Sequence, residues 1–221
     1  MHGDSILLID KPAGMTSFGV VARVRRRLSQ ELGKKAKVGH TGTLDPFATG
    51  LMIIVTGKEC RNAMQYSKLD KEYEATIRLG QTSTTGDPEG EVVAVDGPEP
   101  SREEVDAVLH RFTGEITQRP PIYSAIKING QRAYDLARKG IEVEMPERQV
   151  TVYSLDLVEY SYPEIKIRVH VSSGTYIRTL AQDIGQALGS AAYCTQLRRT
   201  KVADYSVEDA LDLDSVMNDY R

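Results

Sequence analysis

The sequence is poor in the residues that build metal sites and disulfide frameworks. Its 221 residues include no tryptophan, two cysteines and four histidines. Cys60 and Cys194 are too few for a disulfide framework and too far apart for a metal-binding pair, so we expect both thiols to be reduced and structural. The histidines, at positions 2, 40, 110 and 170, form no HxH or HxxxH pair. We therefore predict no metal site.

Long apolar runs are also absent. The longest one near the N-terminus, Ile6–Ile9, is too short for a signal-peptide core or a membrane span, and no basic segment precedes it. Hydrophobic residues make up 40% and charged residues 27% of the chain, and its formal net charge is −3. This composition predicts a cytoplasmic globular protein with no membrane partner and one main domain. We expect a monomer with no obligate protein partner.

Apolar periodicity predicts mixed α and β structure. Strands are expected at 5–9, 51–55, 73–79, 91–95, 151–157 and 165–171. Helices are expected after a cap at Thr16 or Ser17, after the capping-box spacing at 101–104, near 133–139, and after 173–178. The stretch 81–90 is rich in serine and threonine, and we interpret it as a solvated loop.

The most informative segment is Gly39–Gly50, which leads directly into the apolar run Leu51–Val55. It contains three glycines, one histidine, three threonines and a single carboxylate, Asp45. Glycine lets the backbone turn sharply or pass close to a ligand, and the following Pro46 biases the aspartate toward an extended conformation. The segment therefore predicts one carboxylate held rigidly at the mouth of a buried strand.

Other catalytic patterns are missing. The chain has no G-x-G-x-x-G after its first strand, no Walker loop and no G-x-S-x-G elbow, so hydride, phosphoryl and serine acyl transfer lack support. A glycosidase needs a second carboxylate close to Asp45, but the nearest ones, Glu31 and Glu59, lie outside the loop. What remains is a lone carboxylate that acts as a nucleophile or base beside a basic partner.

Charge is distributed unevenly along the chain. Between Val21 and His40 there are seven lysines and arginines against the single Glu31, whereas the segments 87–106 and 204–219 are acidic. Because the basic run leads into the Asp45 loop, we interpret it as a surface for a polyanion rather than only a solvated helix face. The acidic segments are expected to face away from that partner.

Five blocks of sequence, in order, resemble one known family. They are Asp10-Lys11-Pro12-x-Gly14-x-x-Ser17, Gly39–Gly50, Tyr73-x-Ala75-x-x-x-Leu79-Gly80, Pro121-x-Tyr123-Ser124-Ala125-x-Lys127 and Ser173–Arg178. Together they are similar to the TruB family, the bacterial tRNA pseudouridine-55 synthases, from about Ser5 to about Asp214. The resemblance implies an α/β fold with a long, mostly antiparallel mixed sheet, flanking helices and an active-site cleft across the sheet.

The resemblance also implies a reaction. The family isomerises a uridine within the T-loop of tRNA: the bond from C1′ to N1 breaks, the uracil turns while bound, and C5 bonds to C1′. The T-arm stem-loop is then the partner, and no cofactor or metal is needed. Asp45 matches the catalytic nucleophile, and the target uridine must be flipped out of its stack to reach it. Whether Asp45 attacks C1′, attacks C6 or removes a sugar proton stays open.

Further site residues follow from the same match. Arg178 matches the arginine that pairs with the catalytic aspartate, and Tyr73 matches the tyrosine that stacks on the uracil and assists proton removal from C5. Tyr176 and Leu197 match residues that line the uracil pocket, although core packing is an alternative for both.

Two further residues of the match precede Asp45 in the sequence. His40 matches the histidine that fills the space left by the flipped nucleotide and contacts the RNA. Lys11 is expected to shape the substrate pocket rather than to act in the chemistry.

Two functional alternatives stay open, and one family feature is missing. The chain could be a non-catalytic RNA-binding protein that keeps the fold, although intact Asp45, Tyr73 and Arg178 argue against this. It could also modify another RNA, such as ribosomal RNA. Family members usually continue into a small C-terminal RNA-binding domain of the PUA type, and the match here ends just before Arg221. We therefore expect residues 1–221 to be a single catalytic domain without a PUA domain.

Overall fold

The computed structural model describes residues 4–124, 126–128, 130–141 and 143–218, so Ala125 of the fourth sequence block lies outside the described residues. The described chain separates into two compact units. One comprises the described residues of Met1–Glu74 and Leu197–Arg221, and the other comprises those of Ala75–Gln196. The prediction of a single catalytic domain stays a prediction.

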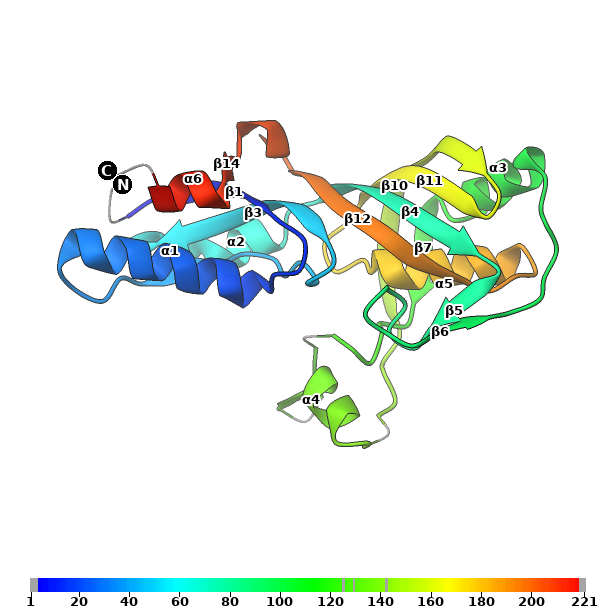
Figure 1. Cartoon of the computed structure of the whole chain (residues 1–221), viewed down its shortest axis with the longest axis horizontal. Coiled ribbons are helices and arrows are strands. Elements are labelled where there is room, and N and C mark those ends of the chain that lie inside the picture. Colours follow the sequence, from blue (N-terminus) through cyan, green and yellow to red (C-terminus); the bar gives the residue numbers. More distant parts are fainter. Residues whose placement is uncertain (1–3, 125, 129, 142, 219–221) are drawn as a thin grey trace. The chain divides into compact units, whose positions relative to one another are not determined.

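The first unit is built on the strands β1 (Ile6–Lys11), β2 (Val38–His40), β3 (Thr49–Thr56), the start of β4 (Lys71–Leu79), the end of β12 (Ala192–Val202), β13 (Tyr205–Ser206) and β14 (Leu211–Asp212). β3 pairs antiparallel with β1 and β2 and parallel with β12. Its helical elements are α1 (Ser17–Leu32), the 3-10 turn η1 (Gly57–Asn62), α2 (Ala63–Ser67), η2 (Val207–Asp209) and α6 (Leu213–Asn218) (Figure 1).

Apolar burial explains why β3 is central to this unit. Residues 50–56 of β3 are all buried, and Leu51, Ile53 and Val55 form a core cluster with Val202 of β12. α1 buries Val20, Val21, Val24 and Leu28, as the helical spacing predicts, whereas Leu32 at its end is exposed. Thr16 caps the helix, because its side chain accepts a hydrogen bond from the amide of Gly19.

The second unit contains the rest of β4 and β12 together with β5 (Gln81–Ser83), β6 (Val92–Ala94), β7 (Gly114–Gln118), β8 (Lys127–Ile128), β9 (Gln131–Arg132), β10 (Arg148–Ser161) and β11 (Glu164–Val171). Its sheet order is β12-β4-β11-β10-β7, and β10 pairs antiparallel with both of its neighbours. Its helices are α3 (Arg102–Arg111), α4 (Ala133–Arg138) and α5 (Ile177–Ala187).

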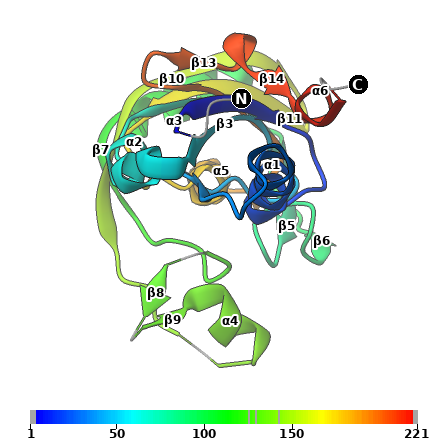
Figure 2. The ribbon, with the colours of Figure 1, turned by 90° about the vertical axis from the view of Figure 1, so that its left-hand side faces the viewer.

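Two helices of this unit follow the predicted patterns. Ser101 and Glu104 form both bonds of the capping box of α3. α5 buries Ile177, Leu180, Ala181 and Ile184 on one face. Figure 2 shows β8, β9 and α4 together on the connection from β7 to β10. The fold class is therefore mixed α/β with a mixed sheet and flanking helices, as predicted.

Candidate active site

Asp45 lies in the loop that joins β2 to β3, and the backbone of this loop is fixed along its length. At its start, the amide of Thr41 donates to the carbonyl of Ile53 at 3.2 Å. At Asp45 itself, the carbonyl accepts a hydrogen bond from the amide of Ala48 at 3.1 Å, which closes a turn over Pro46 and Phe47. The loop is thus an ordered turn that carries one carboxylate.

The first residue of α1 fixes the residue before Asp45. The Ser17 hydroxyl donates to the carbonyl of Leu44 and accepts from the amide of Leu44, and both distances are 2.8 Å. Ser17 and Leu44 are each 3% exposed, so water cannot readily replace these bonds. The position of Leu44, and through it the start of the Asp45 turn, depends on one hydroxyl.

Lys11 and Gly14 fix the residue after Asp45. The fully buried Lys11 ammonium donates to the carbonyls of Pro12 at 2.8 Å, Met15 at 2.7 Å and Pro46 at 3.2 Å. The amide of Gly14 donates to the same Pro46 carbonyl at 2.8 Å. An ammonium with three donors directed at carbonyls organises backbone, whereas the predicted role of Lys11 in shaping a substrate pocket stays a prediction.

The other predicted residues of this unit are placed on strands. His40 ends β2 and pairs with Ile54 across the ladder, in a half-buried position. Tyr73 on β4 and Leu197 on β12 are each 8% exposed. Their roles toward a uracil stay predictions.

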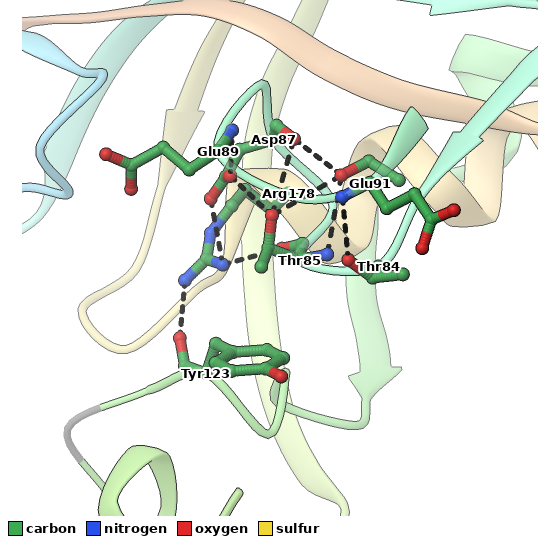
Figure 3. Close-up of polar contacts among 8 residues, drawn as sticks. Thr84, Thr85, Asp87, Glu89, Glu91, Tyr123 and Arg178 are labelled. Atoms are coloured by element: carbon green, nitrogen blue, oxygen red, sulfur yellow. Dashed lines mark hydrogen bonds and ion pairs between the residues drawn. The ribbon is translucent and has the colours of Figure 1, made fainter. Parts of the chain in front are cut away.

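Arg178 belongs to the second unit and is buried rather than on a surface face of α5. Its side chain is 4% exposed, and its guanidinium donates to the carbonyls of Thr85 at 2.7 Å and Tyr123 at 2.8 Å (Figure 3). It also forms an ion pair with Asp87, with 3.2 Å between Nη1 and Oδ2. These contacts come from the 81–90 stretch and from the segment after β7, so they fix the guanidinium from two sides.

The expectation of a solvated loop at 81–90 was wrong. Asp87 is 2% and Ser83 3% exposed, because the carboxylate pairs with Arg178 and also accepts from the Thr85 hydroxyl at 2.5 Å and the Glu89 amide at 3.0 Å. The expectation that the acidic segment 87–106 faces away from an RNA partner stays a prediction. The sequence offered no periodic signal for the burial of Asp87, since a buried loop carboxylate is recognised only through its partner.

Tyr176, the residue before α5, is held through its backbone. Its amide donates to the Gln118 side-chain oxygen at 3.0 Å, and its carbonyl accepts from the Gln118 side-chain nitrogen at 3.2 Å. The Arg148 guanidinium carbon lies 5.5 Å from the centre of the Tyr176 ring. The ring is half-buried, and its predicted place in a uracil pocket remains untested.

The predicted residues therefore fall into two groups. Asp45 lies in the loop that begins directly after His40, Lys11 is hydrogen-bonded to this loop, and Tyr73 and Leu197 belong to the same unit. Arg178 and Tyr176 lie two positions apart at the start of α5 in the other unit. The pairing of Arg178 with Asp45 joins residues of different units and stays a prediction, as does the cleft.

Three further findings concern the described residues alone. Within them, no three His, Cys, Asp or Glu side chains gather closely enough to hold a metal ion. No helix in the same part of the chain has the length and apolar character needed to cross a membrane. Cys60 and Cys194 are free thiols, the first half-buried and the second buried.

Comparison with known families identifies the chain. Residues 26–177 match the model of the TruB family pseudouridylate synthase, N-terminal domain. The chain belongs to the TruB family of pseudouridylate synthases. Residues 178–221 match the model of the tRNA pseudouridylate synthase B C-terminal domain, so the TruB matches continue without a gap to Arg221.

Full-length relatives agree with the TruB assignment. The chain is 50% identical to tRNA pseudouridine synthase B of Phocaeicola vulgatus over 95% of this chain and 90% of the relative. It is 46% identical to tRNA pseudouridine synthase B of Azoarcus sp. over 96% of this chain and 69% of the relative. The five sequence blocks thus lie in a chain that is similar to these enzymes along nearly its whole length.

Solved structures agree with the TruB fold. The Cbf5-Nop10-Gar1 complex contains a chain that is similar with a TM-score of 0.76 and 30% identity, over 99% of this chain and 55% of that one. A chain of an H/ACA RNP bound to a substrate RNA containing 2′-deoxyuridine gives a TM-score of 0.72 and 28% identity, over 97% of this chain and 53% of that one. This chain spans about half the length of those proteins.

Proposed function

We propose that this TruB-family chain isomerises uridine 55 in the T-loop of tRNA to pseudouridine, with Asp45 as the reacting carboxylate. The observation that carries the proposal is the backbone around Asp45, which is tied on one side to Ser17 and on the other to Lys11 and Gly14. A reacting group held in one geometry before substrate arrives is what catalysis by positioning requires. The printed names of the relatives, tRNA pseudouridine synthase B, favour tRNA as the substrate.

The reaction is an isomerisation, so its atoms balance within the uridine. The C1′–N1 bond breaks and a C1′–C5 bond forms, while C5 loses a proton and N1, which carries none in uridine, gains one. Asp45 serves as nucleophile at C1′ or C6, or as the base that removes a sugar proton, and each route needs the ionised carboxylate. A carboxylic acid is ionised at neutral pH unless burial opposes it, and a nearby guanidinium favours the charged form.

Arg178 is the guanidinium that we assign to this task. It is buried, and the carbonyls of Thr85 and Tyr123 and the carboxylate of Asp87 fix its plane. A guanidinium that is already oriented loses little entropy when it meets a second carboxylate. In our proposal, Asp87 therefore positions Arg178, and Arg178 keeps Asp45 ionised.

The remaining predicted residues contact the nucleotide. Tyr73 presents an aromatic face for stacking, which holds a detached uracil without fixing its in-plane orientation. Tyr176 and Leu197 line the uracil pocket, and His40 fills the space left by the flipped nucleotide. Flipping costs a few kcal/mol, which contacts to the rest of the RNA must offset.

α1 is the element that we propose as the docking surface for the RNA. Arg26 is exposed, and Arg25 is oriented by a hydrogen bond from its guanidinium to the Val38 carbonyl at 3.0 Å. RNA stems are recognised through phosphates and shape, so the guanidinium groups of Arg25 and Arg26 suit such a partner, while those of Arg23 and Arg27 pair with Asp214 and Glu31. Neutralising Arg25 and Arg26 should weaken T-arm binding and flatten its salt dependence, whereas an unchanged salt slope would remove α1 from the interface.

Tritium release from 5-tritiated uridine in tRNA tests the proposed reaction. We expect release by the native chain and none by Asp45→Asn, which keeps the size of the side chain but not its charge. Normal release by Asp45→Asn would remove Asp45 from the chemistry. No release by either protein, with T-arm binding intact, would favour a non-catalytic RNA-binding protein. Release from a ribosomal RNA fragment but not from tRNA would assign another substrate.

A further inference from the structure

Arg199 on β12 is a buried guanidinium that the proposed reaction does not yet use. It is 2% exposed. Its Nε donates to the carbonyl of Leu51 at 2.7 Å, and its terminal nitrogens donate to the carbonyls of Gly42 at 3.3 Å and Thr43 at 3.5 Å. These carbonyls lie on both sides of Asp45 in the sequence, and all belong to one unit.

We propose that Arg199 is a positioning residue for catalysis, which sets the conformation of the Asp45 loop by joining its two ends through one planar group. This inference rests on the proposed role of Asp45. Arginine offers five donors in a rigid fork, so it can hold carbonyls at fixed separations. A lysine ammonium would keep the charge at this place but not the geometry of the fork.

Two glycines of the loop lie so close to Arg199 that a side chain at either position would meet it. A Cβ on Gly42 would lie 3.4 Å from Nη1 of Arg199. Gly50, with φ +106°, pairs with Arg199 in the parallel ladder, and a Cβ there would lie 2.3 Å from the Arg199 carbonyl oxygen. The side chain of Arg199 therefore fixes the start of the loop, and its backbone fixes the end.

The charge of Arg199 indicates a role beyond filling space. In the part of the chain that the structure describes, Arg199 forms no ion pair, and the nearby Lys71 is a second buried cation that it repels. Burying charge without a counter-ion is unfavourable, and an apolar side chain could fill the same volume. The hydrogen bonds from Arg199 to the loop carbonyls offset this cost, and an apolar side chain could not form them.

Arg199 also relates the loop to Leu197. Residues two apart on a strand face the same side, and these two are 8% and 2% exposed. Leu197 is a proposed contact of the uracil, and Asp45 is the proposed reacting carboxylate. Arg199 thus sets the position of one with respect to the other within the same unit.

The test compares Arg199→Lys with Arg198→Lys in single-turnover reactions at saturating enzyme. Arg198 is the matched control, because it is the neighbouring arginine on β12 and its guanidinium pairs with Asp10, at 2.7 Å between Nη2 and Oδ2. Its one side-chain contact with the Gly39–Gly50 segment among the described residues is a 3.4 Å hydrogen bond to the Thr49 hydroxyl, whereas Arg199 holds loop carbonyls. We expect Arg199→Lys to slow turnover by about 10- to 100-fold with T-arm affinity within about twofold of native. Arg198→Lys should stay within about threefold of the native rate.

Two measurements separate positioning from loss of folding. The defect of Arg199→Lys should persist at an assay temperature well below its unfolding midpoint, and hydrogen exchange should speed up at amides 41–45 more than in α5. A native rate in folded Arg199→Lys, or a defect that vanishes on cooling, would overturn the proposal. If the native chain itself releases no tritium, the proposed function fails; the exchange measurement then decides the proposal for Arg199 alone.

Discussion

Ser17→Ala should destabilise the protein more than a surface hydroxyl deletion does. The change removes two hydrogen bonds of 2.8 Å and leaves the amide and the carbonyl of Leu44 without that partner. Each buried group that loses its partner costs about 1–3 kcal/mol, and alanine leaves almost no cavity. Because both residues are 3% exposed, we expect a loss of about 2–4 kcal/mol in the free energy of unfolding.

Thr16→Ala is the matched control for this prediction. The neighbouring Thr16 hydroxyl also accepts one backbone hydrogen bond, from Gly19 at 3.0 Å, but it does so at the exposed start of the same helix. Loss of such a cap costs about 1 kcal/mol. The two variants therefore differ in burial and in the number of bonds lost, not in the element affected.

Urea unfolding followed by circular dichroism measures both losses, provided that the dependence on denaturant is the same in all three proteins. A loss for Ser17→Ala below about 1 kcal/mol, or no larger than that for Thr16→Ala, would refute the reasoning. It would mean that Leu44 finds other partners and that the Asp45 loop does not depend on α1.

Two other predictions concern buried groups near the same loop. Burial, with repulsion from Arg199, lowers the pKa of Lys71 to about 8 from 10.5, so the native state releases this proton before the unfolded chain does. Between pH 7 and 10 the native protein should gain about 2 kcal/mol of stability relative to Lys71→Met, and equal pH dependence in both would contradict this. Gly50→Ala should cost more than about 3 kcal/mol, since its Cβ would meet backbone at 2.3 Å. Gly33→Ala, also at positive φ but with nothing within 4 Å, should cost only about 1 kcal/mol in the same denaturation assay.

Local sequence patterns predicted much of the fold. α1, α3 and β3 are where caps and apolar spacing placed them, because a helix that buries one stripe and a strand that is buried on both faces leave strong signals in the sequence. The ordered loop that ends at Gly50 could also be recognised, since glycine and proline restrict the chain locally.

β12 could not be recognised, although both units use it. Its alternation of apolar and polar residues is broken by Arg198, Arg199 and Lys201. Any pattern based on hydropathy predicts that an arginine is exposed, even where it is buried, as Arg199 is. Asp87 was missed for a similar reason, since its burial depends on Arg178, which is 91 positions away in the sequence. The sequence thus predicts which residues are apolar and where the chain turns, but not which charges will be neutralised by distant groups.

The bonds around Asp45 also bear on which molecule changes shape when RNA arrives. The carbonyls of Gly42, Leu44 and Pro46 are already engaged by side chains, so the loop lost its conformational freedom when the protein folded. Such a loop is preorganised and changes its conformation little when a ligand binds. If uridine is the substrate, the distortion must fall on the nucleotide, and RNAs whose loops open easily should be modified first.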